Sequence, residues 1–147
     1  MTDVDRDFIV RNTIERERLM ALVERLEDHE LQLPLGDEWT VAAALTHLAF
    51  WDQRVLALLK HWRRNGVAES PYDADVFNEA LLPLCLAIPA ERAVQLALES
   101  AEAVDREIEQ LTDEMLLAIR ALAKPPRLER ALHRGEHIRD IKRALAE

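Results

Sequence analysis

Three histidines are placed in the sequence so that their imidazoles could bind one metal ion. His133 and His137 lie four residues apart, so on a helix their imidazoles stack one turn above the other and can reach one cation. His47 falls on the apolar stripe of an earlier segment, between Ala44 and Trp51, where an unpartnered imidazole is unfavourable. Placed opposite the other two, it would complete a set of three neutral nitrogen ligands. The remaining coordination positions would stay open to water or substrate, as in catalytic zinc sites.

The same histidines also have simpler interpretations, which the spacing leaves open. A histidine pair at i and i+4 occurs on solvated helix faces as well, and His47 alone is typical of a core imidazole bonded to a carbonyl. His29 and His61 fall near predicted helix ends, where they suit the negative end of the helix dipole. These two are therefore given no role in a site.

The last histidines also belong to the run His133-Arg134-Gly135-Glu136-His137, which fits the H-x-x-E-H pattern of inverted zinc proteases. Glu136 would then be the general base, but no sheet is expected that could hold a peptide substrate. A ferritin-like di-iron site needs paired Glu-x-x-His elements. Because position 130 is arginine and position 44 is alanine, that site is excluded.

Two further residues, Asp140 and Cys85, are of types that can take part in the chemistry of a site. Asp140 follows His137 by three positions and is predicted to accept the second ring N–H of a ligand histidine, which would set its tautomer. The alternative is a solvated acid paired with Arg143 or Arg139. Cys85 has no charged neighbour in sequence, so it is predicted to be a buried, unreactive thiol.

The elements that position these residues are predicted to be helices. Prolines, glycines and one asparagine cut the chain into segments of helical length, and apolar residues recur within them at steps of three and four. We expect long helices over residues 5–29, 40–64, 90–111 and 127–146, and a short one over 112–123. The stretch 66–89 is predicted to be a long connection with one helical turn near 76–82. This pattern favours an all-α four-helix bundle with one long crossover, and a single domain over residues 1–147.

Composition and charge restrict the function classes. Ala, Leu, Glu and Arg are strong helix formers and make up more than half of the chain. A net charge of −9 disfavours binding to nucleic acid and to anionic membranes. A single cysteine excludes an internal disulfide and agrees with a reducing compartment, and no apolar run approaches the length of a membrane span. We therefore expect a soluble cytoplasmic domain.

Three stretches together resemble a known family. Residues 37–51, which read DEWTVAAALTHLAFW, resemble the start of helix two in the DinB-like superfamily. That superfamily includes mycothiol-dependent maleylpyruvate isomerases and ClbS-type proteins. Residues 133–141 resemble its C-terminal His-x-x-x-His element, and residues 72–79 resemble its asparagine-bearing crossover. The three stretches occur in the family's order and span nearly the whole chain.

This resemblance implies an up-down-down-up four-helix bundle, with the long crossover between helices 2 and 3, and a divalent metal, Zn²⁺ or Ni²⁺, held by His47, His133 and His137. It also implies a homodimer and either a transferase or isomerase that uses a low-molecular-weight thiol, or a hydrolase. Two departures stand out. Ala43 occupies a position where many members have an acid, and the run His-Arg-Gly-Glu resembles a signature whose register would make Glu129 and His133 the ligands. A metal-free bundle that binds a ligand or partner through its helix faces is the alternative function.

Overall fold

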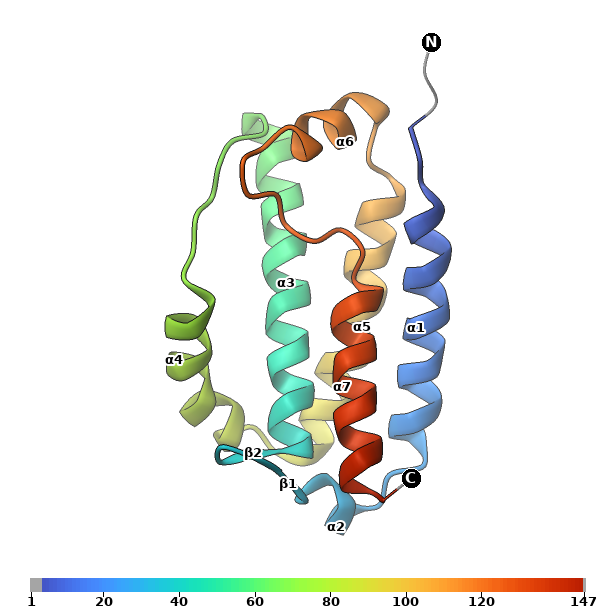
Figure 1. Cartoon of the computed structure of the whole chain (residues 1–147), viewed down its shortest axis with the longest axis vertical. Helices are drawn as coiled ribbons and strands as arrows, with labels where there is room; N and C mark the ends of the chain where they lie inside the picture. The colour runs from blue at the N-terminus through green and yellow to red at the C-terminus, as the bar shows by residue number, and fades with distance from the viewer. Residues whose placement is uncertain (1–3, 147) are drawn as a thin grey trace.

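The structure is a computed structural model that describes residues 4–146, most of them helical (Figure 1). Among these residues, no helix is long and apolar enough to cross a membrane. The predicted helical class is confirmed, with one short hairpin added. In chain order the elements are α1 (Asp7–Glu24), α2 (Asp28–Leu31), β1 (Pro34–Gly36), β2 (Trp39–Thr40), α3 (Val41–Asn65), α4 (Ala74–Ala87), α5 (Ala90–Glu109), α6 (Asp113–Arg120) and α7 (Ala131–Ala144).

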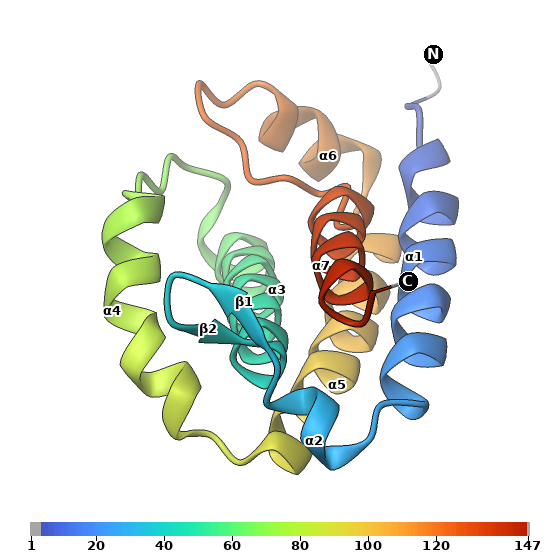
Figure 2. The same cartoon turned by 60° about the horizontal axis from the view of Figure 1, so that its bottom comes forward.

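Helices α1, α3, α5 and α7 lie side by side and pack against one another (Figure 1). α3 packs along α5, and α1 packs along both α5 and α7. α4 lies outside this group against α3, while α6 lies across one end (Figure 2). The β1–β2 hairpin lies near the opposite end, beside α2.

The core follows the predicted apolar stripes on α3 and α5. Ala97, Ala101, Val104 and Ile108 on α5 are all buried, as their alternating spacing of four and three predicted. On α3, Leu48, Val55 and Trp62 are buried in the same way. Trp51 on that stripe is only half-buried, because part of its ring lines an open pocket.

The start of α3 agrees with the capping chemistry of the sequence. The Thr40 hydroxyl accepts a hydrogen bond from the Ala43 backbone N–H at 3.1 Å and so begins α3 as predicted. The hairpin before it was not predicted. Asp37 and Glu38 occupy its turn with φ values of 49° and 70°, which acidic residues adopt uncommonly. The hairpin brings Trp39 to the start of α3, 5.2 Å from the ring of His47.

Two predicted helix boundaries were wrong. The helix predicted over 5–29 ends at Glu24, because Glu27 and Glu30 form a capping box that starts the separate α2. The last helix begins at Ala131 instead of residue 127, after the Pro125-Pro126 pair.

The connection over 66–89 holds a full helix, α4, where a single turn was predicted. Asp73 caps α4 by accepting hydrogen bonds from the Asp75 and Val76 backbone N–H groups. Pro83 lies inside the helix, where proline normally breaks it. Because Pro83 is exposed, the carbonyl that loses its helical donor can be hydrated by solvent.

Candidate metal centre

The packing of α3 and α7 brings His47, His133 and His137 together. Their ligand nitrogens all lie within 4.8 Å of one another. His47 Nδ1 is 3.2 Å from His137 Nε2, which is 3.0 Å from His133 Nε2. Nitrogens bound at the usual zinc–nitrogen distance lie about 3.3 Å apart in tetrahedral geometry and about 2.9 Å apart in octahedral geometry. The observed separations therefore fit a shared divalent cation.

All three imidazoles are held in the neutral form that binds metals. Burial lowers the pKa of His133 to about 2, with further lowering by the neighbouring His137 and Arg130. Burial, followed by the influence of His47, lowers the pKa of His137 to about 3. Burial also lowers the pKa of His47. At neutral pH a metal would therefore not have to displace protons from imidazolium groups.

Asn78 on α4 selects the tautomer of His47. Its Oδ1 lies 2.9 Å from His47 Nε2 and 3.0 Å from Trp51 Nε1. Because the indole N–H can only donate, the Asn78 atom that faces both groups is the amide oxygen. That oxygen accepts from His47 Nε2–H, which leaves the lone pair of Nδ1 free toward the other two histidines. The sequence indicated Asn78 only through its place in the family-like crossover, and it placed Trp51 on the apolar stripe.

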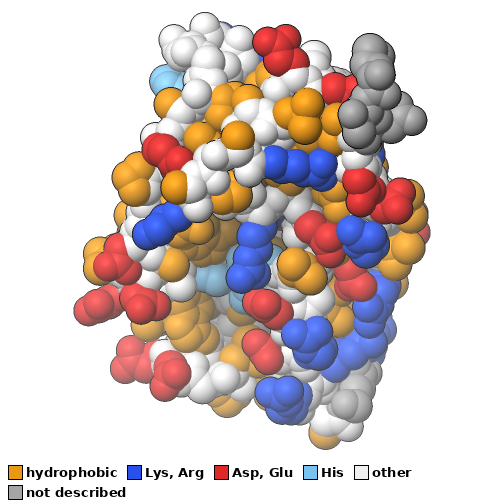
Figure 3. All heavy atoms as spheres, turned by 45° about the horizontal axis from the view of Figure 1, so that its top comes forward, with side chains coloured by type: hydrophobic (Ala, Val, Ile, Leu, Met, Phe, Trp, Pro, Cys, Tyr) orange, Lys and Arg blue, Asp and Glu red, His pale blue; other side chains and the backbone are white. Residues whose placement is uncertain are grey.

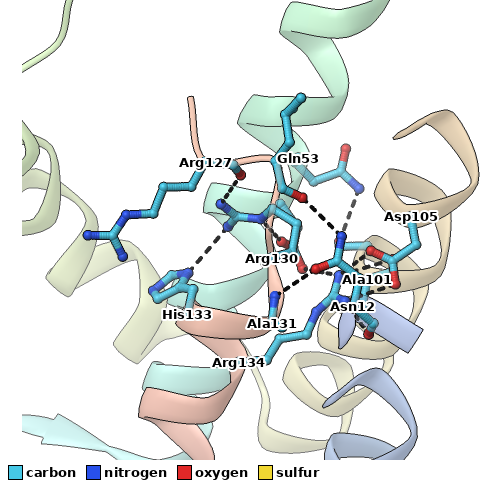
Figure 4. Close-up of polar contacts among 12 residues, drawn as sticks. Asn12, Gln53, Ala101, Asp105, Arg127, Arg130, Ala131, His133 and Arg134 are labelled. Atoms are coloured by element: carbon cyan, nitrogen blue, oxygen red, sulfur yellow. Dashed lines mark hydrogen bonds and ion pairs between the residues drawn. The ribbon is translucent and has the colours of Figure 1, made fainter. Parts of the chain in front are cut away.

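The second ring nitrogen of His133 faces Arg130. Arg130 Nη2 lies 3.3 Å from His133 Nδ1, and a guanidinium can only donate (Figure 4). This contact favours a proton on His133 Nε2, which then donates to His137. A metal on Nε2 requires that proton to move to Nδ1 or to leave. The Arg130 side chain is also held by a second contact, because its Nε donates to the buried Asp52 at 2.7 Å.

Behind the histidines, a network of buried charges fixes α7 against its neighbours (Figure 4). Arg134 is fully buried and donates through Nη1 and Nη2 to both carboxylate oxygens of Asp105 on α5, each at 2.8 Å. Asp105 also accepts from Arg16 on α1 at 2.8 Å. The Asn12 amide of α1 bonds to the backbone at both Leu128 and Ala131, which fixes the start of α7.

These buried arginines were missed at the sequence level, although a signal was present. Arg134 shares a helical stripe with Ile138 and Ile141, at steps of four and three, and both isoleucines are buried. A charged residue on an apolar stripe predicts a buried partner of opposite charge.

A pocket of about 220 Å³ opens beside the histidines, and histidine side chains are visible in the hollow of the molecular surface (Figure 3). Its wall includes Trp51 and Tyr72, whose ring centroids are 5.2 Å apart, together with Asn78. His47 and His133 line the pocket, so a cation held there would be accessible to a small molecule.

Other predicted site residues lie apart from the three histidines. Asp140 is exposed, and its carboxylate lies 3.6 Å from Arg143, which is the alternative that the sequence left open. In this structure the Asp140 carboxylate therefore contacts Arg143 and not a ligand histidine. Glu129 faces Arg11 at 2.8 Å, so the alternative register that made it a ligand is not supported.

The remaining candidates also lack a role in the cluster. Cys85 is buried, and burial raises the pKa of its thiol to about 11, in agreement with the predicted unreactive thiol. Glu136 lies on the surface, 3.9 Å from Arg127. His29 contacts Glu27 and is not part of the histidine cluster.

Comparison with known proteins identifies the family. No curated protein and no solved structure matched the chain. The sequence model of the DinB superfamily matches residues 12–140, which include all three clustered histidines and Asn78. Because this match covers most of the chain and the same stretch builds the histidine cluster, the chain belongs to the DinB superfamily.

Proposed function

We propose that this chain is a metal-dependent enzyme that acts on a small molecule, as a thiol-dependent transferase or isomerase or as a hydrolase. One observation carries the proposal: three neutral imidazole nitrogens, from His47, His133 and His137, converge beside an open pocket. A set of three nitrogen ligands suits Zn²⁺ or Ni²⁺. When bound, such a cation lowers the pKa of a coordinated thiol or water and so supplies a nucleophile at neutral pH.

In this proposal the residues of the site have different roles. His47 provides one ligand from α3, and the two histidines of α7 provide the others. Asn78 keeps the His47 proton on Nε2, away from the metal position. The buried ion pair between Arg134 and Asp105 holds α7 at a fixed distance from α5, and ligands on rigid elements need little reorganisation to bind.

The proposal also includes the finer architecture and setting expected from the family resemblance. The contacts among α1, α3, α5 and α7 support a four-helix bundle, and the course of the chain, with α1 and α7 running opposite to α3 and α5, supports the up-down-down-up order (Figure 1). The single cysteine supports a cytoplasmic location, and the net charge of −9 favours a small-molecule substrate over nucleic acid. A homodimer remains an expectation from the resemblance.

Elemental analysis of protein purified without a histidine tag tests the metal site. We expect one equivalent of divalent transition metal per chain after dialysis against Zn²⁺ or Ni²⁺, and loss of that metal in His47→Ala. The matched control is His61→Ala on the same helix, where the imidazole contacts the exposed Asn65 and is not part of the histidine cluster. Wild-type protein that remains metal-free with both ions would refute the proposal and favour the metal-free bundle.

A further inference from the structure

We propose that the pocket beside the histidines binds an oxyanion, and that the substrate is a small organic carboxylate or phosphate with a flat apolar body. The inference rests on the proposed function in one respect, because it takes this pocket as the substrate site. Its basis is the charge and shape of the pocket wall, which do not depend on a metal.

The pocket wall differs in charge from the rest of the molecule. The chain has 28 acidic and 19 basic residues, yet the wall contains Arg54, Arg127 and Arg130 and no aspartate or glutamate. A concave wall that carries one sign of charge concentrates counter-ions from solution. The wall is therefore suited to an anion even though the protein as a whole repels one.

Arg54 is built as an anion-binding group. Its guanidinium is stacked on Tyr72, with 4.0 Å from Cζ to the ring centroid, and its Nη2 donates to the Ser70 carbonyl at 2.9 Å. Among residues 4–146, no carboxylate lies within ion-pair distance of Arg54. Burial lowers the pKa of this half-buried guanidinium, as expected for a cation that lacks a counter-charge. Its remaining N–H donors are thus held in place and available to a ligand.

The other two arginines of the pocket wall differ in their counter-charge: Arg127 has little, whereas Arg130 is neutralised by a buried acid. Within the described part of the chain, the only ion pair of Arg127 is the 3.9 Å contact with the exposed Glu136. Figure 4 shows the Arg127 side chain extending away from Arg130 and past His133. Arg130 is paired with Asp52 at 2.7 Å, so it positions His133 and adds little net charge. Arg54 and Arg127 therefore supply the positive charge for a ligand.

The shape of the pocket defines the rest of the ligand. A cavity of about 220 Å³ is smaller than the pockets that bind drug-sized molecules, which begin at about 300 Å³. Trp51 and Tyr72 offer aromatic surface for a flat apolar group. A single-ring molecule with one oxyanion matches this combination of size, aromatic wall and charge.

Binding of benzoate and phenyl phosphate to chelator-treated, metal-free protein tests the inference, with neutral benzamide as the control ligand. Isothermal titration calorimetry and intrinsic tryptophan fluorescence, to which Trp51 in the pocket wall contributes, report binding. We expect at least one of the two anions to bind about tenfold or more tightly than benzamide, with affinity that falls as salt increases. The tighter of the two probes identifies the oxyanion as a carboxylate or a phosphate.

Variants locate the binding site. Arg54→Gln is expected to weaken anion binding about tenfold or more, and Arg127→Gln gives an independent second test. Arg92→Gln on α5 is the matched control, because Arg92 contacts the exposed Gln95 and does not line the pocket. Circular dichroism and Zn²⁺ binding of each variant show whether the fold and the histidine cluster are preserved.

The possible outcomes distinguish failure of this inference from failure of the proposed function. Anion binding that Arg54→Gln removes in metal-free protein supports the inference, even if the wild-type protein then takes up no metal and the proposed function fails. Affinities that are equal in wild type, Arg54→Gln and Arg127→Gln would overturn it. So would anion binding that appears only after Zn²⁺ is added and is unchanged by either variant, since the metal alone would then hold the anion.

Discussion

Replacing Asn78 with leucine removes the hydrogen-bond acceptor that sets the tautomer of His47 while keeping a similar side-chain volume. In the native protein the amide oxygen accepts from both His47 Nε2 and Trp51 Nε1, at 2.9 and 3.0 Å. Without it, the indole N–H has one remaining partner, His47 Nε2, which lies 3.0 Å away. That contact places the His47 proton on Nδ1, where the metal would bind.

The expected magnitude follows from this change of tautomer. Loss of a group that orients a ligand histidine lowers metal affinity about 10- to 100-fold, or about 1.4–2.8 kcal/mol of binding free energy. Asn78→Asp keeps an acceptor at the same place, so its affinity should stay near the wild-type value. In the Asn78→Leu background, Trp51→Phe removes the competing indole donor and should recover part of the loss.

Competition with a chromophoric chelator for Zn²⁺ at pH 7 measures these affinities. Asn65→Leu at the exposed end of α3 serves as the control, since its amide is hydrogen-bonded to His61 and not to a histidine of the cluster. The reasoning would be refuted if Asn78→Leu bound Zn²⁺ within about threefold of wild type. It would also be refuted if Trp51→Phe lowered the affinity of the double variant further, because the indole would then support the site instead of competing for His47.

Three further predictions concern buried groups. Arg134→Met leaves the Asp105 carboxylate buried without its main partner. Urea denaturation should therefore show a loss of about 3 kcal/mol or more in the free energy of unfolding. The control Arg139→Met changes an exposed residue and should cost about 0.5 kcal/mol or less. The α7 histidines have folded-state pKa values of about 2 and about 3, below the ordinary 6.5, so the unfolded chain binds more protons at acidic pH. The contribution of these two histidines to the stability of the metal-free protein should therefore be complete only well above pH 6.5. Denaturation at each pH should show the free energy of unfolding falling by about 2 kcal/mol for each histidine between pH 7 and pH 5, and a flat profile would contradict this. The Cys85 thiol, with its pKa raised to about 11, should react with iodoacetamide at pH 8 at least about a hundredfold more slowly than a thiol of pKa 9, and a rate near that of the free thiol would show that Cys85 is accessible.

Most of the helical framework was predictable because local patterns determine it. The stripe on α5 and the Thr40 cap of α3 are interactions between residues three or four apart, and such interactions are read directly from spacing. The length of α4 was underestimated, because Pro83 was taken as a break. Only the exposure of Pro83 on the folded surface shows why the helix can continue through it.

The candidate site was predictable in part. The i, i+4 spacing of His133 and His137 and the place of His47 on an apolar stripe indicated the ligand set, and the structure brings the three together. The partners of those histidines were not predictable. Asp140 was selected by its spacing on the same helix, yet the group that orients His47 is Asn78, which lies 31 residues away on another helix.

The sequence by itself determined the helical class, the family and the three histidines, because each depends on residue type and on spacing within a segment. Tertiary structure alone decided which ring nitrogen of His47 faces the others, which arginines are neutralised by buried acids, and that Arg54 keeps no carboxylate partner within residues 4–146. These properties depend on pairs of groups from different helices. Their strength is set by distance and burial, and neither quantity exists until the helices have packed.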